Sequence, residues 1–129
     1  MIPPQQTFFD AVGGEPTFRR IVGRFFELVR QDDVLSSVYP LDDLDGAEER
    51  LGLFLIQYWG GPTTYSDARG HPRLRMRHAP FRIGAAERDA WVAAMRVAIE
   101  EAQLDEAHRA QLCGYIDSTA THMINSGSA

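Results

Sequence analysis

The chain has 129 residues, a length that we expect to form one domain over residues 1–129. Hydrophobic residues make up 44% of it, which excludes a disordered chain, and no apolar run approaches the roughly 18 residues of a membrane span. The net charge of −5 argues against a basic surface that binds nucleic acid.

The cysteine content and the N-terminus indicate a compartment. Cys113 is the only cysteine, so an intramolecular disulfide is excluded, and its helical context favours a small buried side chain. The N-terminus has no basic region followed by an apolar stretch, as a secretory signal would. We therefore expect a cytoplasmic protein.

Apolar residues recur at helical spacing through the first half of the chain. The spacing predicts a short helix over residues 8–12 and a longer amphipathic helix that includes residues 15–29. Two adjacent aspartates favour a short helical turn within residues 32–39. A third helix is predicted over residues 43–59, with its buried face extending to Tyr58.

The second half alternates between loop and helix. Residues 63–72 show no apolar period and contain glycine and proline, so they are predicted to form a loop. A short helix over residues 73–78 follows, and then two long helices over residues 85–102 and 105–124. No alternating run of β-branched residues indicates a strand, so the predicted fold class is all-α.

One histidine, His78, follows a segment with three arginines and precedes the helix-stopping Pro80. A histidine on a short helix between two longer helices is well placed to ligate a metal, and haem iron is often held in this way. The residues alone leave open the alternative of an ordinary surface or core side chain. The other histidines, His71, His108 and His122, are more consistent with structural, capping or solvated roles.

Five segments in combination resemble a known family: Phe9–Gly14, Tyr39–Pro40, Gly46–Leu51, Gln57–Pro62 and Gly70–Phe81. The chain is similar over nearly its whole length to the group II truncated haemoglobins, and most similar to their actinobacterial, haemoglobin O-like branch. The resemblance implies a truncated globin fold, which is a two-over-two helical sandwich around haem.

The resemblance also implies a function. The expected cofactor is haem b, and the expected activity is reversible binding of dioxygen and other diatomic ligands, such as nitric oxide and carbon monoxide, at a five-coordinate ferrous iron. An alternative is a haem enzyme for nitric oxide dioxygenation or peroxide-dependent oxidation, supplied by an external electron donor. A helical interaction domain without cofactor is a third alternative. Each of these three functions is compatible with a homo-oligomer.

By this resemblance, His78 is the proximal haem ligand, and its second ring nitrogen donates to a carbonyl such as that of Leu74. Arg77 is the expected partner of a haem propionate, because guanidinium pairs well with carboxylate. Arg50 and Tyr65 are further candidates for this contact. Apolar contacts to the macrocycle are implied for Leu51, Phe54, Leu55, Met76 and Phe81.

The resemblance places the distal ligand pocket around Tyr39 and Trp91, whose polar tips would donate hydrogen bonds to a ligand. Their alternative role is that of buried aromatics bonded to a backbone carbonyl. Phe26 departs from the family, since many members carry a tyrosine there, and losing one donor costs roughly 1 kcal/mol of ligand stabilisation. Ala47 excludes a second histidine on the iron and opens a route from solvent, while Leu51 is expected to lie over the ligand.

Overall fold

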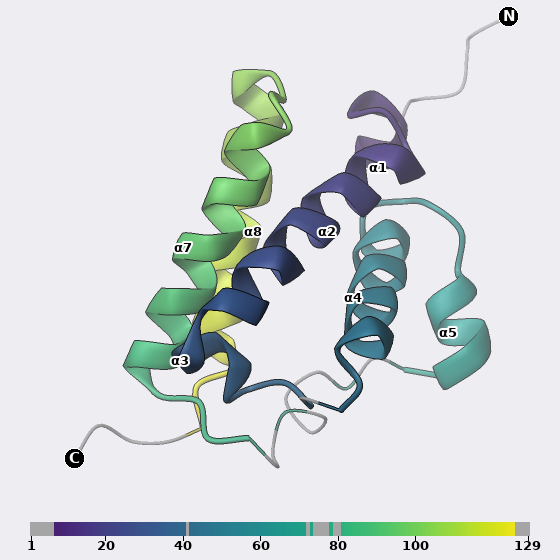
Figure 1. Cartoon of the computed structure of the whole chain (residues 1–129). Coiled ribbons are helices and arrows are strands. Elements are labelled where there is room, and N and C mark those ends of the chain that lie inside the picture. The colour runs from purple at the N-terminus through teal and green to yellow at the C-terminus, as the bar shows by residue number, and fades with distance from the viewer. Residues whose placement is uncertain (1–6, 41, 72, 74–77, 79–80, 126–129) are drawn as a thin grey trace, which may run out of the picture.

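The computed structural model describes residues 7–125 except 41, 72, 74–77, 79 and 80 (Figure 1). The described residues form helices and no strands, which confirms the all-α prediction. None of these helices has the length and apolar character that crossing a bilayer requires. In chain order they are α1 (Phe8–Ala11), α2 (Glu15–Gln31), α3 (Asp33–Ser36), α4 (Leu44–Tyr58), α5 (Thr64–Arg69), α7 (Ala85–Glu101) and α8 (Glu106–His122).

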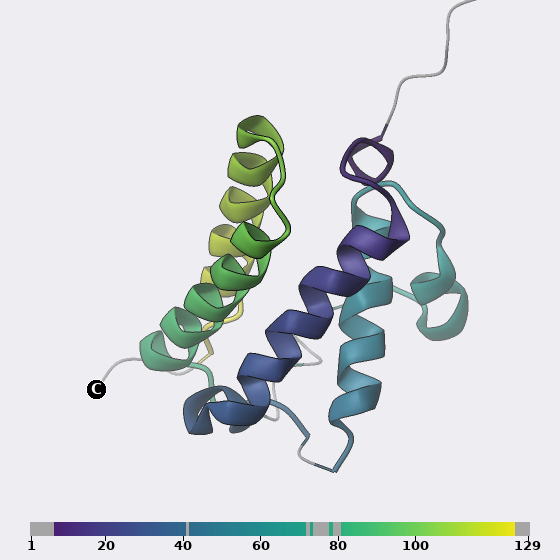
Figure 2. The ribbon, with the colours of Figure 1, turned by 45° about the horizontal axis from the view of Figure 1, so that its top comes forward.

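The long helices form two pairs. Helix α2 packs along α4, and α7 packs along α8. Helix α2 also contacts α7, so it joins the two pairs: α4 lies on one side of α2 in Figures 1 and 2, and α7 and α8 lie on the other. The short helices α3 and α5 pack on α7 and α4, respectively. This is the two-over-two arrangement that the family resemblance implies.

The centre of the core is the apolar face of α2. Six of its side chains recur at three- and four-residue spacing and are at most 2% exposed: Phe18, Ile21, Val22, Phe25, Phe26 and Val29. Burial of each such side chain contributes roughly 1.5–3 kcal/mol. This face packs against buried residues of both α4 and α7, so α2 fixes the position of α4 relative to α7.

Aspartates cap the start of three helices. The side chain of Asp32 accepts hydrogen bonds from the first free N–H groups of α3, and those of Asp43 and Asp105 do the same for α4 and α8. The turn between α1 and α2 instead uses Gly13 and Gly14, whose φ angles of +111° and +73° disfavour residues with a Cβ. These local signals explain why the predicted boundaries of the long helices lie within a few residues of the observed ones.

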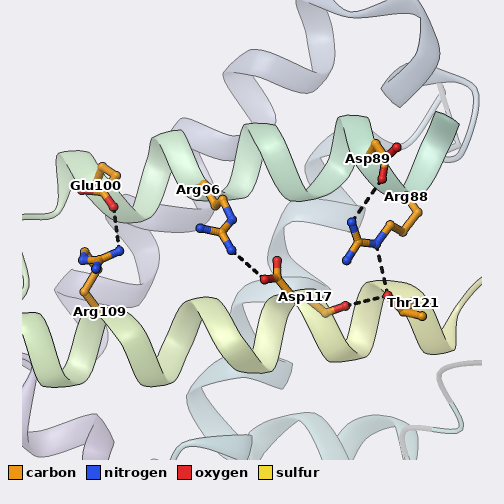
Figure 3. A network of polar contacts seen from close by, with 7 residues as sticks. All are labelled: Arg88, Asp89, Arg96, Glu100, Arg109, Asp117 and Thr121. Atoms are coloured by element: carbon orange, nitrogen blue, oxygen red, sulfur yellow. Dashed lines mark hydrogen bonds and ion pairs between the residues drawn. The ribbon is translucent and has the colours of Figure 1, made fainter. Parts of the chain in front are cut away.

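Polar contacts fix the register of α7 against α8 (Figure 3). The pairs are Arg88–Thr121 at 3.1 Å, Arg96–Asp117 at 2.6 Å and Arg109–Glu100 at 3.1 Å. Partner numbers rise along one helix as they fall along the other, so the two helices are antiparallel. Because these side chains are half-buried or exposed, the contacts specify alignment more than they stabilise the fold.

Two sequence predictions are wrong. Residues 64–69 form α5 rather than a loop, because the side-chain amide of Gln57 on α4 holds Ser66 by two hydrogen bonds. Nε2 of Gln57 donates to Oγ of Ser66 at 2.6 Å, and Oε1 of Gln57 accepts from the backbone N–H of Ser66 at 2.9 Å. Tyr58 is 53% exposed rather than buried, since it packs on the ring of Tyr115 near the surface, with centroids 4.3 Å apart. The helix predicted over residues 73–78 lies outside the described residues except for Arg73 and His78.

Candidate functional site

A cavity of about 240 Å³ opens between α4, α5, the segment that follows α3 and the segment that contains His78. Among the described residues, its walls combine apolar side chains with one imidazole, two phenols and two guanidinium groups. The lining residues are Val38, Tyr39, Pro40, Ala47, Arg50, Leu51, Phe54, Tyr65, Arg69, His78 and Phe81. Eight residues that the family resemblance assigned to the haem site therefore meet around one cavity, although they come from four separate segments.

One face of α4 forms a wall of the cavity. Ala47, Arg50, Leu51 and Phe54 occupy positions i, i+3, i+4 and i+7, so their side chains lie on the same side of the helix. Ala47 is the smallest of them, and it leaves space where a larger side chain would fill the cavity. The guanidinium of Arg50 is held by the carboxylate of Asp43, the cap of this helix, with Nη1 to Oδ2 at 3.1 Å.

Helix α5 supplies a second wall. Tyr65 is 4% exposed, and its ring meets Phe54 edge to face with centroids 5.7 Å apart. Arg69 lines the cavity one helical turn later. The sequence prediction missed Arg69, because the direction of a side chain cannot be inferred from spacing in a segment that is predicted to be a loop. The four-residue spacing of Tyr65 and Arg69 was the signal that would have found it.

His78 is half-buried and lines the cavity. Its carbonyl oxygen accepts a hydrogen bond from the N–H of Phe81 at 3.0 Å and another from Nδ2 of Asn125 at 3.3 Å. Within the described residues, no group of three or more His, Cys, Asp or Glu side chains surrounds a common point. The described lining of the cavity therefore offers a single imidazole and not a cage of protein ligands for a bare metal ion.

Tyr39 and Trp91 form a polar pair beside His78. Nε1 of Trp91 donates to the hydroxyl of Tyr39 at 2.9 Å, across 52 residues of chain. Burial raises the pKa of Tyr39, and the hydrogen bond from Trp91 lowers it by less. The Tyr39 hydroxyl therefore stays protonated. In the described part of the chain no acceptor is found for that proton, so the hydroxyl can donate it to another group.

Phe26 lies behind Tyr39 rather than in the cavity lining. It is fully buried, and its ring meets that of Tyr39 edge to face with centroids 5.0 Å apart. Trp91 lines a smaller neighbouring cavity of about 40 Å³, which shares Val38, Tyr39 and His78 with the larger one. Neither Phe26 nor Trp91 is a described lining residue of the larger cavity, but both contact Tyr39, which lines it.

Three further residues were predicted to contact the cofactor: Leu55, Met76 and Arg77. Leu55 is 3% exposed in the main core and does not line the cavity. Met76 and Arg77 lie outside the described residues, so their predicted contacts remain predictions. Besides Arg69, the sequence prediction missed Val38 and Pro40, which flank Tyr39 and line the cavity with it. Their adjacency to a predicted pocket residue was the available signal.

Comparison with known proteins places this geometry in a family. The family model for bacterial-like globins matches residues 7–125. The curated group 2 truncated hemoglobin YjbI of Bacillus subtilis is 36% identical over 121 residues, which cover 94% of this chain and 90% of that protein. The chain belongs to the group II truncated haemoglobins.

Solved haemoglobin structures share the fold of this truncated haemoglobin. A thermostable hemoglobin from the actinobacterium Thermobifida fusca has a TM-score of 0.92 and 54% identity, covering 95% of this chain and 100% of that one. The group II truncated hemoglobin from Bacillus anthracis has a TM-score of 0.92 and 34% identity, covering 98% and 97%. The likeness therefore extends over the whole cavity region.

The family implies haem as the prosthetic group of this truncated haemoglobin, and the cavity residues fit that group. A porphyrin brings four nitrogen ligands of its own, so one imidazole from the protein suffices. The apolar side chains of Leu51, Phe54 and Phe81 suit a flat hydrophobic ring, and Arg50 and Arg69 suit its carboxylates.

Proposed function

We propose that this truncated haemoglobin holds haem b through His78 and reversibly binds dioxygen and other diatomic ligands at the five-coordinate ferrous iron. The observation that carries the proposal is the shared cavity, in which His78 and Tyr39 both form part of the wall. Haem supplies the redox-active iron that binds such ligands, and the protein tunes the environment of that iron.

Several features support a non-covalent haem with one protein ligand. The only cysteine, Cys113, is buried in the main core and does not line the cavity, so no thiol is placed for covalent attachment. Among the described lining residues His78 is the only histidine. The raised pKa of Tyr39 keeps its side chain a neutral phenol, which donates hydrogen bonds and is a poor metal ligand.

The proposed role of Tyr39 follows from its hydrogen-bond capacity. A phenol oxygen both accepts and donates, and the acceptor role is taken by the N–H of Trp91. The phenol proton is left to donate toward a ligand that gains negative charge, as donors do in an oxyanion hole. Trp91 therefore acts mainly by fixing the orientation of this hydroxyl.

Titration with hemin tests the proposal. We expect the apoprotein to take up one equivalent with a sharp Soret band, and the reduced form to show a five-coordinate high-spin spectrum that changes when carbon monoxide or dioxygen is added. Stopped-flow oxygen association and dissociation rates then distinguish a carrier from a tight holder. A protein that gains no Soret band, or a reduced form that is six-coordinate without added ligand, would contradict the proposal.

The protonation state of Tyr39 predicts how ligand release depends on pH. Because the folded-state pKa of Tyr39 lies above its ordinary value of about 10, the hydroxyl stays a donor and oxygen dissociation should be flat in pH up to about 9. By linkage, the stability that Tyr39 contributes is fully present below pH about 10 and falls as the pH rises toward the folded-state pKa.

Oxygen dissociation rates measured in steps from about pH 6 to 9 check this prediction, together with the same series for Tyr39→Phe. The unchanged protein and the variant should both give flat profiles. A rise in rate below about pH 9 that disappears in Tyr39→Phe would show that the hydroxyl ionises in that range.

A further inference from the structure

Asn125, just beyond the end of α8, joins the end of the chain to the segment that carries His78. Its Nδ2 donates to the carbonyl oxygens of Phe81 at 2.9 Å and His78 at 3.3 Å. Its Oδ1 accepts from the N–H of Ile83 at 2.9 Å. Its backbone N–H donates to the carbonyl of Ile83, also at 2.9 Å. Four hydrogen bonds thus tie one residue to residues 78–83.

The contacts use a property of the amide side chain. An amide has two N–H hydrogens and a carbonyl oxygen, and here both hydrogens donate and the oxygen accepts. The pattern also fixes the orientation of the amide, because the reversed one would turn its oxygen toward two carbonyls. A carboxylate of the same shape would keep only the acceptor and would place negative charge beside those carbonyls.

A separate apolar cluster holds the same two segments together and joins them to the segment that contains Tyr39. Val38, Ile83 and Met123 are its buried residues, at 6%, 6% and 9% exposed, and Tyr39, Phe81 and Ile124 pack against them. The cluster therefore joins the Tyr39 segment, the segment after His78 and the end of α8. The hydrogen bonds of Asn125 lie beside this cluster. Apolar packing therefore holds the end of α8 in place, and the amide of Asn125 links that end to the backbone of His78.

From this geometry we infer that Asn125 is a positioning residue for the proximal histidine. The inference rests on the proposed function, in which His78 holds the haem iron. The direction of an imidazole depends on its own backbone, and ligands need to be held to within about 0.5 Å of the productive geometry. Asn125 fixes the His78 carbonyl and thereby the Cα from which the ring projects.

The test uses two variants of the full chain loaded with haem. Asn125→Asp keeps the shape and the acceptor but removes both donors, and Asn125→Leu removes all three side-chain hydrogen bonds. We expect both to shift the iron–histidine stretching frequency of the reduced protein in resonance Raman spectra. We also expect hemin transfer to apomyoglobin to be about tenfold faster, as for other residues that orient a metal ligand.

A matched control separates positioning from general loosening of α8. Asp105 caps the other end of this helix by accepting from the N–H of His108 at 3.0 Å, and it lies outside the contacts with residues 78–83. Asp105→Ala should lower the melting temperature but leave the stretching frequency and the hemin transfer rate unchanged. If it alters both as strongly as the Asn125 variants do, the positioning role is overturned.

The outcomes also distinguish this inference from the proposed function. If the unchanged protein takes up hemin and shows an iron–histidine band, the proposed function stands. Asn125 variants with the same band and the same hemin transfer rate would then overturn the positioning role alone. If the unchanged protein takes up no hemin, the proposed function fails and the inference fails with it.

Discussion

Replacing His78 with alanine is expected to abolish stable haem retention. Among the described residues that line the cavity it supplies the only imidazole, so the variant would leave apolar contacts and the cavity arginines to hold the group. The protein should purify with little Soret absorbance and should lose added hemin rapidly to apomyoglobin. Added free imidazole should restore part of the band, because the small ligand can enter the space left by the side chain.

His122→Ala is the matched control, since His122 is an exposed histidine at the end of α8 and does not line the cavity. It should retain haem as the unchanged protein does. Circular dichroism of both apoproteins checks that the helices remain. If His78→Ala held hemin as tightly as His122→Ala, the proximal assignment would be wrong.

Replacing Tyr39 with phenylalanine is expected to speed oxygen dissociation. The change removes the hydroxyl of this lining residue and leaves the ring, so apolar packing is nearly conserved. Loss of one hydrogen bond to the ligand corresponds to a rate about five- to tenfold higher. Stopped-flow displacement of oxygen by carbon monoxide measures it directly.

Two further variants show which residue supplies the donor. Trp91→Phe removes the N–H that holds the Tyr39 hydroxyl, so its effect should be smaller, and in the double variant the two effects should not add because both act through one hydroxyl. Phe26→Tyr adds a hydroxyl beside Tyr39 and should slow oxygen release. Release that is unaffected by all three changes would show that ligand retention depends on other groups.

The fold could be predicted well from the sequence because its signals are local. The period of the α2 face, the aspartate caps and the Gly13-Gly14 turn are each read within a few residues. Helix α5 was missed because what stabilises it is not local: Gln57 holds Ser66 from the neighbouring helix. A six-residue helix shows too little period to be recognised by itself.

The site could be predicted in part, and mostly through family resemblance. The α4 wall was accessible, since helical spacing alone places Ala47, Leu51 and Phe54 on one face. The hydrogen bond from Trp91 to Tyr39 spans 52 residues, and that from Asn125 to the His78 carbonyl spans 47. Pairings of this kind depend on how the helices cross, which no local pattern specifies.

The antiparallel alignment of α7 and α8 brings the start of one helix beside the end of the other. Trp91, in the first half of α7, donates to the Tyr39 hydroxyl, and Asn125, beyond the end of α8, donates to the backbone carbonyl of His78, the proposed haem ligand. If haem binds as proposed, both the distal hydroxyl and the proximal histidine are therefore supported from the open end of the α7–α8 pair. Local unfolding at this end of α7 and α8 would weaken the binding of both the cofactor and its diatomic ligand. The rates of haem loss and of oxygen dissociation should therefore rise together on warming.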